Sequence, residues 1–132
     1  IAFAYGPVML HETLLASEHL AAQGFGLSVV NMPWLNRIDG AWLTSMVRAH
    51  RHVAVVEDHA PSGALGDAIL DVLVAREMAG GRVFRKYGVE GFPACGTPSE
   101  ALRHHGLDGE SLARRILAQC GRRADPAVAR AL

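Results

Sequence analysis

At residues 53–68 the chain reads VAVVEDHAPSGALGDA, and this stretch changes character twice. It opens with a short run of apolar, mostly β-branched residues, which is typical of a strand buried on both faces. Glu57, Asp58 and His59 end the run, because a buried strand cannot easily hold charged groups. After the Pro-Ser-Gly turn, apolar residues recur with the period of a helix. The stretch therefore predicts a strand, a tight loop and a helix.

The predicted loop has the features of an anion-binding helix start. Ser62 is a candidate N-cap, and Gly63 and Gly66 allow a neighbouring group or a ligand to approach the backbone closely. The first N–H groups of a helix have no intrahelical acceptor and lie at the positive end of its dipole. Such a helix start is able to bind a small anion.

The segments on either side alternate between strands and helices. We expect strands at residues 1–5, 27–32, 53–56 and 82–87, and the charges in the last segment favour an edge position in the sheet. In the first helix the apolar spacing predicts one shared face, formed by Leu10, Leu14, Ser17 and Ala21, with Leu20 beside them. The alternation predicts right-handed crossovers, and hence an α/β fold: a three-layer α/β/α sandwich around a mainly parallel sheet.

The C-terminal part carries two helix starts. Residues 97–100 read TPSE, a capping box with proline at the first helical position, and Gly106 ends that helix. Asp108 is the N-cap of a second helix. We expect residues 1–120 to form one domain and residues 121–132 to be a frayed tail or a short helix.

Composition excludes several function classes. The formal net charge is zero, so neither nucleic acid nor an acidic membrane surface is expected as a partner, and no apolar run has membrane-spanning length. Cys95 and Cys120 show no metal-ligand spacing, which predicts a reducing, cytoplasmic setting, and Cys95 is interpreted as a small buried residue. His11 and His19 are too far apart to share a zinc site. The chain begins at Ile1 inside a strand-like run, which predicts a piece of a longer protein.

Several segments resemble the C-terminal domain of transketolase-family proteins. The similar segments are VVEDH at 55–59, SGALGDAI at 62–69, RVFRKYGVEGFPACGTP at 82–98 and LRHHGLD at 102–108. Gly6 and His11-Glu12 resemble the family's first helix start, and Cys95 stands where the family usually has serine. The likeness runs in the same order and spacing from Ile1 to about Leu117.

The resemblance implies a part of a transferase that uses thiamine diphosphate and a divalent metal such as Mg²⁺. The family includes transketolases, deoxyxylulose-phosphate synthases and beta subunits of 2-oxoacid dehydrogenases, and its cofactor and catalytic residues lie in two other domains. The chain has no Gly-Asp-Gly…Asn motif, so no residue receives a catalytic or metal-binding role, and the isolated chain should be inactive. The implied role is dimer assembly with the rest of the parent enzyme, together with a regulatory small-anion site.

The resemblance also implies a strand order of second, first, third, fourth. Ligands of such sheets bind beyond the carboxyl ends of the strands, where the chain path diverges between the first and third strands. The candidate anion-binding residues at that point are Gly6, His59, Ser62, Gly63 and Gly66.

Two alternatives stay open. The chain could be a freestanding flavodoxin-like domain that binds a small ligand, or a protein-interaction domain. The cluster of Glu57, Asp58 and His59 could act in acid–base chemistry, but a polar strand end whose carboxylates cap the loop is the preferred interpretation.

Overall fold

Four parallel strands form the central layer of the computed structural model, which describes residues 1–121. Their order across the sheet is β2-β1-β3-β4, with bounds β1 (Ala2–Tyr5), β2 (Val29–Met32), β3 (His52–Val56) and β4 (Val83–Tyr87). In register, Phe3 lies opposite Val30 on one side and Val55 on the other. The predicted strand order, the parallel pairing and the edge position of the fourth strand are all confirmed.

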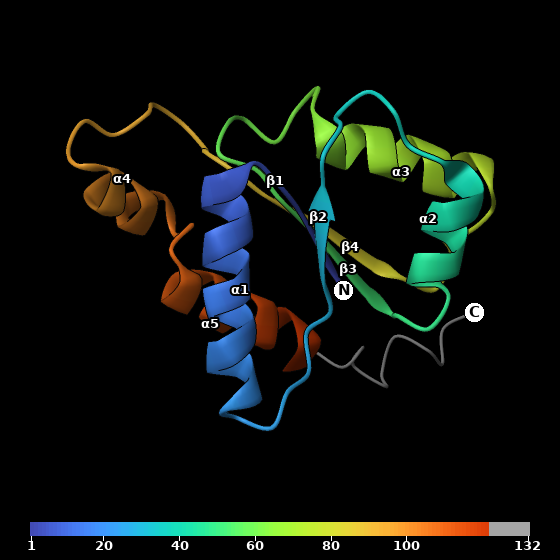
Figure 1. Cartoon of the computed structure of the whole chain (residues 1–132), viewed down its shortest axis with the longest axis horizontal. Coiled ribbons are helices and arrows are strands. Elements are labelled where there is room, and N and C mark those ends of the chain that lie inside the picture. The colour runs from blue at the N-terminus through green and yellow to red at the C-terminus, as the bar shows by residue number, and fades with distance from the viewer. Residues whose placement is uncertain (122–132) are drawn as a thin grey trace, which may run out of the picture.

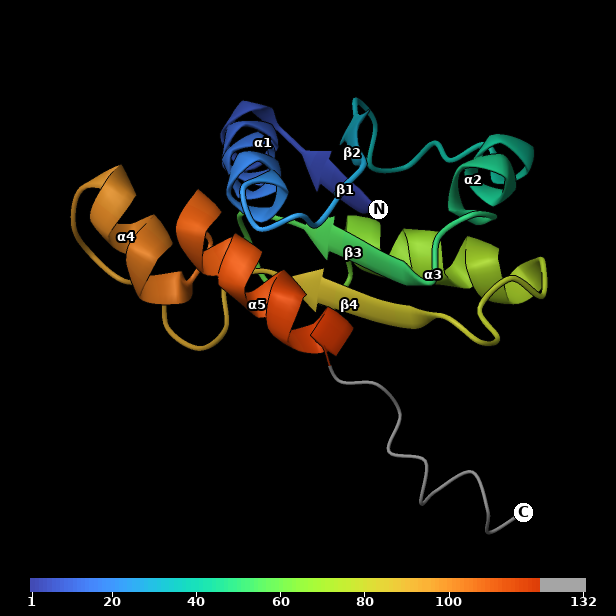
Figure 2. The same cartoon turned by 90° about the horizontal axis from the view of Figure 1, so that it is seen from below.

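Helices cover both faces of this sheet, as predicted for a three-layer sandwich. Their bounds are α1 (Pro7–Ala21), α2 (Gly40–Val47), α3 (Leu65–Ala75), α4 (Pro98–His105) and α5 (Gly109–Gly121). Figures 1 and 2 show α1 and α5 on one face and α2 and α3 on the other, with α4 beyond the end of the sheet. Among the described residues, no helix is long and apolar enough to cross a bilayer.

Along β1 and β3, most side chains that face α1 and α5 are small, although Val56 and, on β4, Tyr87 share that face. Ala2, Ala4 and Ala54 pack under α1 and α5, whereas Phe3, Val53 and Val55 pack under α2 and α3. The alternation follows from the period of a strand, which sends successive side chains to opposite faces. Small residues under α1 leave room for its larger buried side chains.

The predicted inner face of α1 is wrong except at Leu20, which is buried as expected. The other fully buried positions are Met9, Thr13 and Ala16, each one residue before an expected position, and Leu14 is 47 % exposed. The prediction relied on the spacing of the leucines. Helix α1 packs against both the sheet and α5, so its buried side chains lie on the face between these two neighbours. A polar Thr13 is tolerated there because its hydroxyl donates to the Met9 carbonyl at 2.6 Å.

The helix start at Asp108 is confirmed, and it places α5 against α1. Asp108 Oδ1 accepts from the Ser111 N–H at 3.1 Å. The next residue, Gly109, donates its N–H to Glu12 Oε2 at 2.7 Å. A Cβ on Gly109 would lie 2.5 Å from the Leu15 Cβ, so only glycine permits this crossing distance.

The capping box at Thr97 is also confirmed. Its N–H donates to Glu100 Oε2 at 2.8 Å, and its hydroxyl oxygen accepts from the Glu100 N–H at 3.4 Å. The Thr97 hydroxyl also donates to Glu100 Oε2 at 2.7 Å, and this bond, followed by the bond from the Thr97 N–H, holds the pKa of Glu100 below its usual range. Gly106 ends α4 with a left-handed φ of 64°.

The far end of α5 is joined to β4 through Tyr87. The Tyr87 hydroxyl donates to Gln119 Oε1 at 2.9 Å, and the Arg115 guanidinium lies 4.8 Å from the ring centroid. Burial raises the pKa of Tyr87 to about 12. Helix α5 runs to Gly121, and the rest of the predicted tail, residues 122–132, lies outside the described residues, so the proposed domain boundary stays a prediction.

Candidate functional site

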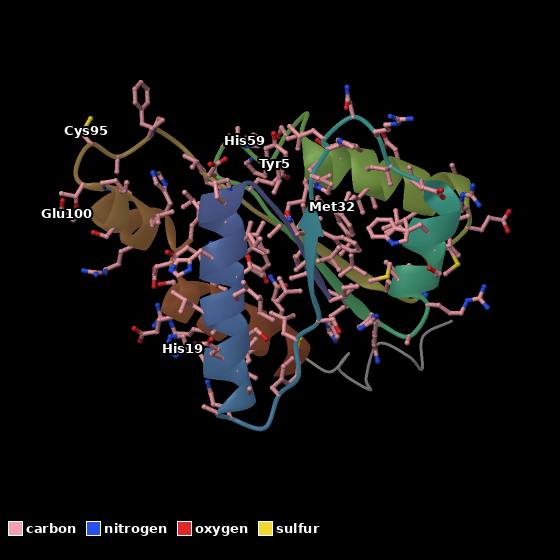
Figure 3. The ribbon with its side chains drawn as sticks, viewed as in Figure 1. Tyr5, His19, Met32, His59, Cys95 and Glu100 are labelled. Carbon is pink, nitrogen blue, oxygen red and sulfur yellow. The ribbon has the colours of Figure 1, made fainter. Side chains whose placement is uncertain are left out.

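The carboxyl ends of β1 and β3 lie side by side, because the two strands are parallel neighbours. The carboxyl ends of the strands form an edge of the sheet that is distinct from the lateral edge at β4. Figure 3 shows Tyr5, Met32 and His59 together at this edge, with Cys95 and Glu100 further out toward α4. The edge is the place where a doubly wound sheet offers a ligand site. It also holds all five candidate residues, on the segments that follow β1 and β3.

Glu57 is the buried centre of this edge. Its side chain is fully buried directly after β3, and its two oxygens accept from the Leu65 N–H at 2.9 Å and the Gly66 N–H at 3.1 Å. A carboxylate at the positive end of a helix is stabilised by the helix dipole. Glu57 therefore caps α3 from the preceding strand.

Ser62 does not cap α3, and that prediction is wrong. The N-cap position is Ala64, which offers no side-chain acceptor, and Ser62 is exposed two residues earlier. The loop is longer than the Pro-Ser-Gly turn suggested, so the helix starts later. Glu57, at the end of β3, accepts the hydrogen bonds from the first N–H groups of α3 that Ser62 was expected to accept.

A second carboxylate holds the loop before α3. Asp67 Oδ2 accepts from the Gly63 N–H and its Oδ1 accepts from Lys86 Nζ on β4, both at 2.6 Å. The Lys86 bond, followed by the Gly63 bond, lowers the pKa of Asp67. The N–H groups of Gly63 and Gly66, expected to be free, thus already donate to carboxylates of the chain itself.

Lys86 explains the glycine at position 66. A Cβ on Gly66 would collide with the Lys86 side chain and lie 3.0 Å from Glu57 Oε1. Glycine is needed for packing against the chain, as the close-approach argument predicted, although the group that approaches is a lysine. Sequence analysis did not predict the ion pair of Asp67 and Lys86. The available signal was an acidic residue in the first turn of a helix, where a carboxylate is stabilised by the helix dipole.

His59 links the two carboxylates that precede it. Its Nε2 lies 3.4 Å from Glu57 Oε2 and its Nδ1 lies 3.2 Å from Asp58 Oδ1, while 41 % of its side chain is exposed. The predicted cluster is therefore assembled in space. Both carboxylate oxygens of Glu57 accept hydrogen bonds from the start of α3. This favours the structural interpretation of the cluster over acid–base chemistry.

The remaining candidate, Gly6, lies at the start of α1. It has a φ of 80°, and no side chain caps the helix that follows. Beside it is a depression of about 370 Å³, whose lining includes Tyr5, Gly6, Asn31 and Pro33. The anion site formed by Gly6, His59, Ser62, Gly63 and Gly66 stays a prediction.

Cys95 is exposed, so its interpretation as a small buried residue is wrong. It lies in the loop before α4, which stands outside the core. The neighbouring Ala94 N–H donates to His105 Nε2 at 3.1 Å, and this bond gives His105 a structural role. Among residues 1–121, no three histidine, cysteine, aspartate or glutamate side chains are grouped as a metal ion would require.

Replacing Glu57 tests the cap. We expect Glu57→Ala to lower the free energy of unfolding by about 3 kcal/mol, because two buried N–H groups lose a charged acceptor. Glu57→Gln should cost less, since its carbonyl can still accept from one of them. Urea unfolding followed by circular dichroism measures both.

Asp58→Ala is the matched control, because this neighbouring carboxylate is 53 % exposed. It should change the free energy of unfolding by no more than about 0.5 kcal/mol. Equal losses for Glu57→Ala and Asp58→Ala would contradict the capping role.

Comparison with known proteins places this chain in one family. A family model described as "Transketolase, C-terminal domain" matches residues 2–112. A 1-deoxy-D-xylulose-5-phosphate synthase of Thermobifida fusca is 34 % identical over 123 residues, covering 92 % of this chain and 19 % of the relative. A putative transketolase C-terminal section of Methanocaldococcus jannaschii is 32 % identical over 107 residues, covering 80 % of this chain and 32 % of the relative.

Solved structures agree. A protein titled "Split gene transketolase, inactive beta4 tetramer" matches with a TM-score of 0.76 and 28 % identity, over 89 % of this chain and 37 % of that one. The chain thus spans about a third or less of the two curated relatives named above. The family match covers most of the sequence, and the parallel sheet has the strand order implied by the resemblance. This chain belongs to the transketolase C-terminal domain family.

Proposed function

We propose that this chain is the non-catalytic C-terminal domain of a thiamine-diphosphate-dependent enzyme of the transferase class, and that it contributes to dimer assembly. The family match over residues 2–112 carries the proposal. Relatives named transketolase and 1-deoxy-D-xylulose-5-phosphate synthase are several times longer than the matched region. In this proposal the parent enzyme is cytoplasmic and holds thiamine diphosphate and Mg²⁺ in its other domains.

An apolar surface near α4 supports the assembly role. The Phe92 side chain is 96 % exposed in the loop that leads to α4. Val89, at the start of that loop, lines an apolar groove of about 210 Å³ together with Val8, Pro98 and Leu102. Exposed aromatic rings and apolar grooves are each typical of interaction surfaces. The rest of the parent enzyme, or its dimer partner, is the proposed occupant.

A freestanding domain that binds a small ligand or another protein is the alternative function. The depression beside Gly6, at the uncapped start of α1, favours it. This alternative shares with the main proposal a weak site for sulfate or phosphate at Gly6, His59 and Ser62, next to Gly63 and Gly66. Glu57 and Asp67 already accept the N–H groups at the α3 end of that site. The start of α1, the partly exposed His59 and the exposed Ser62 hydroxyl are therefore its proposed donors.

We expect the isolated chain to have neither transketolase nor deoxyxylulose-phosphate synthase activity and not to bind thiamine diphosphate. The reason is that no position matches a cofactor ligand of the family. Calorimetric titration with thiamine diphosphate and MgCl₂ measures binding, and a complete transketolase serves as the positive control. A specific, magnesium-dependent isotherm with the isolated chain would reject the non-catalytic role.

Phe92→Ser tests assembly in the complete gene product. We expect at least about a tenfold weaker dimer, because buried interface aromatics commonly contribute more than 1 kcal/mol. Sedimentation at a series of protein concentrations measures the dissociation constant. Val74→Ser is the control, because Val74 is also exposed (60 %) but lies on α3. Unchanged dimerisation of the Phe92 variant would argue against this surface.

Phosphate titration followed by amide chemical shifts tests the anion site at the carboxyl ends of the strands. We expect a dissociation constant of about 1 mM, which corresponds to roughly 4 kcal/mol. Ser62→Ala and His59→Ala should each weaken binding, because each removes a donor. The site does not exist if phosphate leaves the amides around Gly6 and Gly63 unshifted.

A further inference from the structure

Two loops meet at the opposite, amino-terminal edge of the sheet. The turn between α2 and β3 and the loop between α3 and β4 are joined where the Val83 N–H donates to the Arg51 carbonyl at 2.9 Å. Between them lies an open depression of about 370 Å³. Its lining residues are Arg48, Ala49, His50, Arg51, Gly80, Gly81 and Arg82. We call it the arginine depression.

The arginine depression carries uncompensated positive charge. Three of its seven lining residues are arginines and none is acidic. The ion pairs found among residues 1–121 involve His59, Lys86 and Arg114, so none of the three arginines has a carboxylate within 4.0 Å. The chain as a whole has no net charge, so this concentration of one sign is local.

Arg82 is held in place by neutral acceptors. Its Nη1 donates to the Met78 carbonyl at 2.7 Å, and its Nε and Nη2 donate to the Val47 carbonyl at 3.3 and 3.2 Å. These carbonyls orient the guanidinium group without removing its charge. Arg48 and Arg51 are exposed, and their guanidinium groups donate to no acceptor within the described part of the chain.

The glycine turn adds backbone donors to the same depression. The N–H groups of Gly80 and Gly81 have no acceptor among residues 1–121. No atom lies within 4 Å of a Cβ built on either glycine, so the space over the turn is open. Gly81 has a φ of 73°, a conformation that favours glycine.

The His50 side chain, which forms one wall of the depression, is held in place through both ring nitrogens. Its Nδ1 lies 2.9 Å from the Met46 carbonyl and its Nε2 lies 3.2 Å from Ser28 Oγ. The carbonyl can only accept, so Nδ1 donates to it, and Nε2 is already paired with the serine hydroxyl. The donors of the arginine depression are therefore guanidinium and backbone N–H groups.

We propose that the arginine depression binds a phosphate group, either as inorganic phosphate or as a phosphate monoester. Guanidinium groups match the geometry of phosphate oxygens, and free backbone N–H groups of a glycine turn are suited to a small, multiply charged anion. The proposal does not depend on the parent enzyme's activity. It also differs in place from the site near His59, because the two lie at opposite ends of the parallel strands.

Amide chemical shifts during separate titrations with inorganic phosphate, glycerol 3-phosphate and glycerol test the proposal on the 132-residue chain. We expect both phosphates to shift the amides of residues 48–52 and 80–82, and glycerol to shift none of them. A stronger response to glycerol 3-phosphate assigns the site to phosphate monoesters, and an equal response assigns it to the phosphate group alone. Affinity should fall between about 0.01 M and 0.15 M salt, since the site is exposed.

The double variant Arg48→Ala and Arg51→Ala should weaken phosphate binding about tenfold, because two charged donors are lost. Both side chains are exposed, so the variant should keep a dispersed amide spectrum. Arg37→Ala with Arg103→Ala is the charge-matched control, since both residues are exposed elsewhere. The proposal is overturned if phosphate shifts only the amides of residues 59–66, or if the control loses as much affinity as the double variant.

Discussion

The two hydrogen bonds from the start of α3 to the buried Glu57 carboxylate are the constraint on which this edge of the fold depends. A buried carboxylate is costly unless its oxygens are satisfied, and a helix start is costly unless its N–H groups find acceptors. The carboxylate supplies the acceptors that the helix start needs, and the helix start supplies the donors that the carboxylate needs. The pairing fixes how far the loop after β3 extends, and it places His59 between two carboxylates. The segment from Glu57 to Gly66 has the sequence features of a ligand-binding turn, but its hydrogen bonds connect β3 to α3.

Local sequence signals predicted the elements that depend on local chemistry. The capping box at Thr97, the cap at Asp108 and the helix end at Gly106 follow from side chains within a few residues of one another, and all three are confirmed. The strand order followed from resemblance, because no periodicity reports which strands are neighbours. The α1 face was mispredicted since it depends on α5, whose approach at Gly109 is set by residues about a hundred positions away.

The candidate site shows the same division. The sequence placed the polar residues at the correct strand end, because charges cannot continue a buried strand. It did not reveal which acceptor each N–H group would use. Asp67 and Lys86 stand 19 positions apart, and only the adjacency of α3 and β4 brings them together. The arginine depression likewise requires two loops that are distant along the chain.

The bond between the Gly109 N–H and the Glu12 carboxylate spans 97 positions of the chain. Forming it closes almost the whole domain into one loop, and the entropy of such closure must be met before the contact contributes any stability. The β1–α1–β2 part can be made from contacts between neighbours in sequence, but the α1–α5 layer cannot. While α5 is still inside the ribosome, α1 alone therefore covers that face of the sheet, and the apolar residues that α5 would cover stay open to solvent until α5 arrives.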